Sequence, residues 1–222
     1  MENGYGIEAS QHDSANTGNL TVNSSGPITA GYDGIWAQSS GSGTVKVTTT
    51  ASGTIDAGSW AGNGVGIGAV SNYTGTGAVI VDARGNITTE QSNGIFAAIY
   101  NSANGNNVRV TAGNVSSLGS EAIYAIAFGT GDVRTDTLSG TNATTSSSGA
   151  YANYAAALGG NVTINSAGNA SGGGGIYGYA ENTGNVTINL TGSANATGSN
   201  GNGVWGYAAG NGTVTINTGS GV

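Results

Sequence analysis

The chain has 222 residues, of which 43 are glycine and one is proline, and only 7% of its residues are charged. That charged fraction is far below the roughly 25% of ordinary soluble proteins, and the net charge of −7 includes only four basic residues. With no basic stripe and no apolar run long enough to cross a bilayer, the composition argues against nucleic-acid binding and against membrane insertion of this segment. The absence of cysteine excludes disulfides, thiolate metal sites and cysteine nucleophiles.

The N-terminal residues do not resemble a signal peptide, and the first repeat begins at Gly6. Met1-Glu2-Asn3 lacks the basic start and apolar core of a signal peptide. Because the repeat is under way by Gly6, we expect the chain to be a fragment with an added methionine, organised as one repeat domain over residues 1–222.

Successive repeats align on a Gly-Ile-x-Ala-like segment. They start at Gly6, Gly34, Gly66, Gly94, Ala122, Gly149, Gly175 and Gly203, with steps of 26 to 32 residues. A fixed period between about 20 and 50 residues indicates a solenoid or another repeat array.

Each repeat has two clear apolar pairs and a weaker third segment. The first pairs are Ile7/Ala9, Ile35/Ala37, Ile67/Ala69, Ile95/Ala97, Ile123/Ala125, Ala150/Ala152, Ile176/Gly178 and Val204/Gly206. The second pairs are Leu20/Val22, Val45/Val47, Val79/Val81, Val108/Val110, Val133/Thr135, Val162/Ile164, Val186/Ile188 and Val214/Ile216. The third segments centre on Ile28, Ile55, Ile87, Val115, Ala143, Ala170 and Ala196. Apolar residues two positions apart, with a polar residue between them, indicate β-strands.

Three short strands per repeat predict an all-β fold, a single-domain right-handed parallel β-helix (β-solenoid) of about eight coils. Each strand pairs in parallel with its counterpart one coil later, at a spacing of about 4.8 Å, and the crossover rule favours the right-handed coil. A β-propeller is the alternative, but its blades normally need about 40 to 50 residues.

A polar residue follows each second pair and should stack from coil to coil. The column reads Asn23, Thr48, Asp82, Thr111, Asp136, Asn165, Asn189 and Asn217. Stacked asparagines can form hydrogen bonds from amide to amide along the axis, and asparagine tolerates the backbone that corners require. We therefore interpret the column as corner chemistry.

The repeats resemble the β-helical passenger regions of bacterial autotransporters, the type V secreted surface proteins. The motifs that carry the resemblance are Gly160-Asn161-Val162-Thr163-Ile164-Asn165, Gly184-Asn185-Val186-Thr187-Ile188-Asn189 and Gly212-Thr213-Val214-Thr215-Ile216-Asn217. The resemblance covers essentially the whole chain and implies a parent protein located at the cell surface or secreted.

No catalytic, metal or cofactor site is predicted. Asp132 and Asp136, with Arg134 between them, are the closest carboxylate pair, but four strand residues span about 13 Å, too far for a glycosidase pair acting alone. We interpret them, together with Arg109 one coil away, as a solvated charge cluster. The single histidine, His12, lies in a polar bend without a nucleophile motif.

The outward residues of the first strands include an aromatic stripe. The tentative binding residues are Trp36, Phe96, Tyr124, Tyr151, Tyr177 and Trp205, extended by Tyr179 and Tyr207. Exposed rings on one flank are unusual in a soluble monomer. They suggest self-association or contact with a host or neighbouring-cell protein or with a glycan, while part of the stripe could be purely structural.

These observations favour a non-enzymatic structural stalk and adhesion or self-association segment of a bacterial surface or secreted protein. The alternative is a carbohydrate-binding or polysaccharide-cleaving β-helix. That alternative needs a groove with convergent carboxylates, and the scarcity of acidic and basic groups weighs against it.

Overall fold

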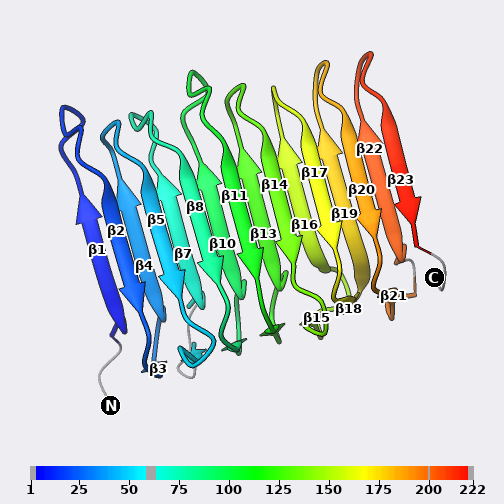
Figure 1. Ribbon diagram of the computed structural model, residues 1–222, viewed down its shortest axis with the longest axis horizontal. Coiled ribbons are helices and arrows are strands. Elements are labelled where there is room, and N and C mark those ends of the chain that lie inside the picture. The colour runs from blue at the N-terminus through cyan, green and yellow to red at the C-terminus, as the bar shows by residue number, and fades with distance from the viewer. Residues whose placement is uncertain (1–3, 59–63, 200, 220–222) are drawn as a thin grey trace.

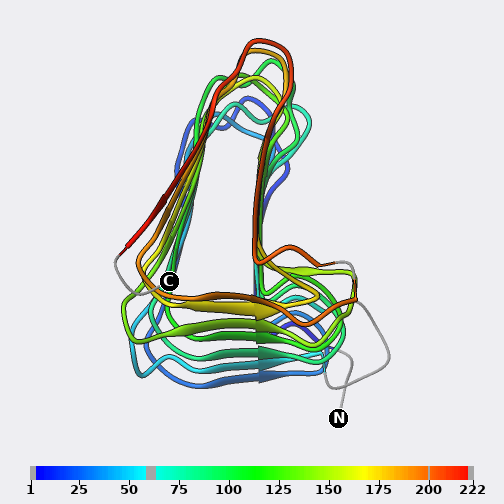
Figure 2. The same cartoon turned by 90° about the vertical axis from the view of Figure 1, so that its right-hand side faces the viewer.

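The computed structural model describes residues 4–58, 64–199 and 201–219 and shows an all-β solenoid built from three parallel sheets. Figure 1 shows the strands side by side along the long axis of the molecule. Viewed along that axis in Figure 2, two long walls meet in turns at one end, and a third sheet joins them at the base. The predicted parallel β-solenoid is confirmed, and its right-handedness stays a prediction.

Sheet A forms one wall and takes the first strand of every coil. Its strands are β1 (Ile7–Gln11), β4 (Ile35–Ser39), β7 (Ile67–Ser71), β10 (Ile95–Ile99), β13 (Ile123–Ala127), β16 (Tyr151–Ala157), β19 (Gly174–Ala180) and β22 (Val204–Ala208).

Sheet B forms the opposite wall. Its strands are β2 (Leu20–Ser24), β5 (Val45–Thr49), β8 (Val79–Ala83), β11 (Val108–Ala112), β14 (Val133–Thr137), β17 (Val162–Ser166), β20 (Val186–Leu190) and β23 (Val214–Thr218). The pairing of Val45 with Val79, and of Val79 with Val108, follows the predicted register.

Sheet C closes the base with shorter strands. These are β3 (Ile28–Ala30), β6 (Ile55–Ala57), β9 (Ile87–Thr89), β12 (Val115–Ser117), β15 (Asn142–Thr145), β18 (Asn169–Gly172) and β21 (Ala194–Ala196). From the sequence we expected Ala196 to pair with Ala170. The structure instead pairs Ala194 with Ala170 and Ala196 with Gly172.

The core consists of aliphatic side chains stacked in columns between the three sheets. Ile35, Ile67, Ile95 and Ile123 succeed one another in sheet A, and each is inaccessible to solvent. Because alternate strand residues point to opposite faces, the apolar pairs of the inner coils reach this interior, whereas Val214 and Ile216 of β23 are each 43% exposed. Burial of these columns from water supplies the main driving force for folding.

The corner between sheets C and A explains the glycine that begins most repeats. A Cβ atom at Gly34 would lie 2.6 Å from the carbonyl oxygen of Gly66 and would also clash with Cγ2 of Ile55. The chain therefore passes too close to the next coil for any side chain at this position.

The sixth coil departs from the predicted alignment. We expected Ala150 and Ala152 to lie opposite Ile123 and Ala125, but the strands pair Asn153 with Ile123 and Ala155 with Ala125. The repeat that was expected to start at Gly149 is thus shifted by three residues. The alignment was wrong because it required an apolar residue in the inward column, whereas the fold places Asn153 there.

Among the described residues, no helix is long and apolar enough to cross a membrane.

Candidate functional site

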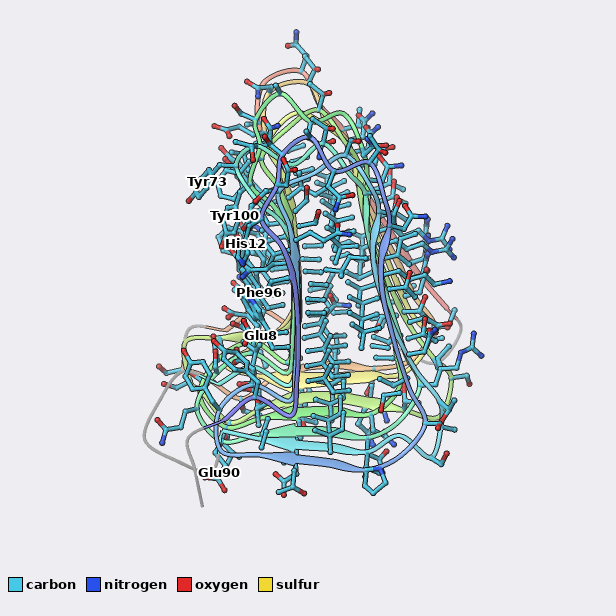
Figure 3. The ribbon with its side chains drawn as sticks, turned by 90° about the vertical axis from the view of Figure 1, so that its left-hand side faces the viewer. Glu8, His12, Tyr73, Glu90, Phe96 and Tyr100 are labelled. Carbon is cyan, nitrogen blue, oxygen red and sulfur yellow. The ribbon has the colours of Figure 1, made fainter. Side chains whose placement is uncertain are left out.

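The outward side chains of sheet A fall into three columns. The first reads Glu8, Trp36, Gly68, Phe96, Tyr124, Tyr154, Tyr177 and Trp205. The second reads Ser10, Gln38, Val70, Ala98, Ile126, Ala156, Tyr179 and Tyr207. The third, just beyond the strands, includes Tyr100, Phe128 and Leu158. We call this surface, from Phe96 to Tyr207, the aromatic face. Figure 3 shows Phe96, Tyr100 and Glu8 on the outer side of the wall, away from the packed interior.

The rings of the first column stack from coil to coil. Their centroids lie 5.6 Å apart for Phe96 and Tyr124, 4.9 Å for Tyr124 and Tyr154, 5.0 Å for Tyr154 and Tyr177, and 4.7 Å for Tyr177 and Trp205. These separations follow the spacing of parallel strands and fall within the range of favourable aromatic pairs. The stack is therefore a consequence of strand register.

The residue of coil six in this column is Tyr154, not Tyr151 as the sequence alignment predicted. Tyr151 pairs with Gly174 in the neighbouring strand, and its ring lies over that glycine. It still joins the aromatic face from the side, with its centroid 5.0 Å from that of Tyr177. The correction follows from the three-residue shift in β16.

The aromatic face has a small apolar core of its own, which sequence reasoning missed. Ala98, Ile126 and Ala156 point outward, yet they are 0%, 7% and 1% exposed because rings of the first and third columns cover them. The sequence did contain a signal for this core, since an isoleucine and two alanines occupy outward positions where a sheet that faces water normally carries polar residues. Part of the stripe is therefore structural.

The rings of the aromatic face are more exposed to solvent in the last coil than in the earlier coils. The rings of Phe96, Tyr124, Tyr154 and Tyr177 are half-buried, whereas Trp205 is 41% and Tyr207 is 46% exposed. Burial, with a further contribution from neighbouring tyrosines, raises the pKa values of Tyr154 and Tyr177 to about 12. These hydroxyls stay protonated at neutral pH, so the rings form an uncharged surface.

The charged residues of sheet B form local ion pairs. The Nε atom of Arg134 lies 2.8 Å from Oδ2 of Asp136, and Nη2 of Arg109 lies 3.7 Å from the same oxygen. Burial raises the pKa of Asp136, but hydrogen bonds from Arg134 and Asn165 outweigh it and leave the pKa below its usual value. Asp132 accepts a hydrogen bond from the backbone N–H of Asn161 at 2.8 Å. Both carboxylates are therefore held by neighbouring protein groups.

No metal centre is evident in the part of the chain that the structure describes. Residues 4–58, 64–199 and 201–219 contain no group of three or more His, Asp or Glu side chains arranged to hold an ion.

The predicted polar column forms a hydrogen-bonded ladder in the later coils. Side-chain amides donate from Asn165 to Asp136 at 2.6 Å, from Asn189 to Asn165 at 2.8 Å and from Asn217 to Asn189 at 2.7 Å. The interpretation as corner chemistry was wrong, because these residues, like Asn23 and Asp82, lie within the strands of sheet B. The strands are five residues long and extend past the second apolar residue.

Two further ladders were not predicted. Asn161 and Asn185 stack just before their sheet B strands, where Asn161 accepts hydrogen bonds from the backbone and the side chain of Asn185. On sheet C, Asn114 donates to Asn86 at 2.9 Å and Asn169 donates to Asn142 at 3.1 Å. The solenoid therefore uses asparagine to link successive coils at three places.

Replacing Asn189 by alanine should lower the free energy of unfolding by about 1–2 kcal/mol, because two ladder hydrogen bonds are lost. The matched control is Asn23→Ala, at the same position of β2, where no ladder bond is formed among the described residues. Its effect should stay within about 0.5 kcal/mol. Urea unfolding compares the two variants, and equal losses would show that the ladder contributes nothing.

Comparison with protein-family models, with curated proteins and with solved structures finds no match for this chain.

Proposed function

We propose that this chain is a rod-like segment of a bacterial surface or secreted protein, of the autotransporter passenger type, and that it associates with other copies or with partner proteins through its aromatic face. The fold supports the rod, since three parallel sheets run along the axis with continuous pairing. The Gly-Asn-Val-Thr-Ile-Asn repeats support the autotransporter type.

The observation that carries the proposed contact is the continuous column of stacked rings on an outer sheet face. Some of these rings cover the small apolar core of the aromatic face, whereas Trp205 and Tyr207 remain 41% and 46% exposed and are available for contact. Tyrosine and tryptophan are enriched at protein interfaces, where they anchor contacts. Weak contacts repeated along a regular face would also add together.

This proposal is preferred to a polysaccharide-cleaving enzyme because of how the carboxylates of sheet B are engaged. Asp136 binds two arginines and an asparagine, and Asp132 binds backbone and side-chain groups of Asn161. A glycosidase needs two carboxyl groups that face the same glycosidic bond.

Sedimentation velocity over a range of concentrations tests the proposal. We expect the unmodified chain to associate as its concentration rises, and the Trp205→Ser/Tyr207→Ser double variant to associate at least about tenfold more weakly, because two anchor rings are removed. Both side chains are largely exposed, so their loss should leave the core intact.

The control is Leu118→Ser, which removes an apolar side chain that is 54% exposed just beyond β12, outside sheet A. Its association should equal that of the unmodified chain. A chain that remains monomeric at every concentration, or a double variant that associates as strongly as the unmodified chain, would contradict the proposed self-association.

A further inference from the structure

The aromatic column of sheet A is interrupted in the third coil. Gly68 lies between Trp36 and Phe96, each one strand away. A Cβ atom at Gly68 would clash with Cε3 and Cζ3 of Trp36, so the indole lies over the glycine. The Trp36 ring thus takes the space that a side chain at position 68 would need.

A groove of about 360 Å³ is lined by Trp36 and Phe96, the two rings on either side of this interruption. Aromatic rings supply most of its walls, with Trp36, Phe96 and Tyr100 on the sheet side, and Tyr5 and Tyr32 at the corner where the chain enters sheet A. The rings of Tyr5 and Tyr32 meet edge to face, with centroids 5.4 Å apart. The volume is within the range of small-molecule sites.

One carboxylate lines the groove, and it is buried. Asp33 is only 4% exposed. Its Oδ1 atom accepts a hydrogen bond from the backbone N–H of Val65 at 2.7 Å, while Oδ2 has no hydrogen-bond donor among the described residues. None of the ion pairs formed by the described residues includes Asp33. A buried carboxylate without a counter-ion is unfavourable for folding and therefore indicates a functional role.

The charge distribution favours a cationic occupant. All four basic residues lie in or directly after strands of sheet B, namely Lys46, Arg84, Arg109 and Arg134. Sheet A instead carries Glu8 on its outer side, and Glu8 adds to the negative potential at Asp33. Burial raises the pKa of Asp33, and the nearby charge of Glu8 raises it further. The hydrogen bond from Val65 lowers it, but the net result is a pKa of about 6. The carboxylate is thus largely ionised at neutral pH, and no ion pair among the described residues compensates its charge.

We propose that this groove binds a small quaternary ammonium cation, with its methyl groups against the rings of Trp36, Phe96 and the tyrosines and its charge compensated by the carboxylate of Asp33. Aromatic rings attract such cations through their quadrupoles, and the attraction grows in desolvated sites. A primary ammonium or a sugar needs several hydrogen-bonding groups. The amide nitrogen of Asn93 in this groove is already bonded to Glu121 at 3.0 Å.

This inference concerns a ligand site and does not depend on lateral association of the rod. The test is titration of the folded chain with choline and with 3,3-dimethyl-1-butanol, its uncharged analogue of the same shape, followed by nuclear magnetic resonance of the ligand methyl groups. Choline should bind at least about tenfold more tightly than the alcohol. Its methyl signal should move upfield, because the methyl groups lie over ring faces.

Two variants examine the two halves of the site. Asp33→Asn keeps an oxygen that can accept the Val65 hydrogen bond but removes the charge, and it should weaken choline binding about tenfold or more without affecting the alcohol. Trp36→Leu should weaken choline binding and reduce the upfield shift. The matched control is Glu181→Gln, which removes a carboxylate just after β19, outside the groove, and should leave the affinity unchanged.

Equal binding of choline and the alcohol, or no binding of choline, would overturn the proposal. So would undiminished binding to the Asp33→Asn variant, provided that circular dichroism shows the β-structure of each variant to be intact. An equal loss with Glu181→Gln would show that the cation is attracted by acidic residues in general and would exclude this groove as its site.

Discussion

Replacing Asp33 by asparagine is expected to raise the free energy of unfolding at pH 7.5 by about 1–3 kcal/mol. The pKa of this carboxyl group is about 6 in the folded chain, against an ordinary value of 3.8. The difference corresponds to about 3 kcal/mol at 25 °C. Asparagine removes the buried charge and keeps an oxygen that can accept the backbone hydrogen bond of Val65.

The pH dependence of this effect follows from the sign of the shift. Between about pH 4 and pH 6 the folded chain retains the Asp33 proton that the unfolded chain has lost, so stability falls as the pH rises through this window. Below about pH 4 the group is protonated in both states and the cost disappears. The advantage of Asp33→Asn should therefore be complete above pH 6 and vanish below pH 4.

Urea unfolding at pH 7.5 and at pH 3.5 measures the effect. Asp56→Asn, which neutralises an exposed carboxylate in β6, is the control and should change stability by no more than about 0.5 kcal/mol at either pH. An Asp33→Asn variant that is less stable than the unmodified chain at pH 7.5 would show that the ionised group is satisfied in the fold. An advantage of the same size at both pH values would show that its charge is not the cause.

Replacing Asn153 by valine should also stabilise the chain, by about 1–3 kcal/mol. Asn153 is completely buried in the inward column of sheet A, between Ile123 and Ile176. Neither its Oδ1 nor its Nδ2 atom has a hydrogen-bond partner in the described part of the chain. Valine removes the unpaired amide and continues the aliphatic column.

The reverse change in the neighbouring coil provides the matched comparison. Ile123→Asn buries a second amide at the adjacent position and removes apolar contacts, so it should destabilise the chain by at least about 3 kcal/mol. Thermal unfolding measures both variants, and each kcal/mol should move the midpoint by about 2–4 °C in a chain of this size. A lower midpoint for Asn153→Val would mean that the amide makes a stabilising contact, such as one to a buried water.

The strands and the core could be predicted from the sequence because both depend on local patterns. Residues such as Val45 and Val47 are two apart, and that spacing alone places them on the same side of a strand. The repetition of the pattern at Val79 and Val81, and again at Val108 and Val110, then predicts parallel stacking. The structure pairs these residues as expected.

The register of the sixth coil could not be predicted in the same way. Gly149-Ala150-Tyr151-Ala152 matches the repeat as well as the correct segment around Asn153-Tyr154-Ala155 does. Only the pairing with the coils on both sides decides between the two segments. That pairing buries Asn153 in the core without hydrogen-bond partners among the described residues. The aromatic stripe was predicted in outline, but Tyr151 was assigned a place that belongs to Tyr154.

The sequence by itself determined the solenoid, the inward columns and the existence of an outward line of rings, because a side-chain period of two and a repeat of about 28 residues are properties of the chain alone. The tertiary structure decided which rings touch, which outward residues are buried, and that Asp33 lines one groove together with Trp36 and Phe96. Those facts depend on distances between coils, since Trp36, Gly68 and Phe96 are neighbours only after three turns of the chain have stacked.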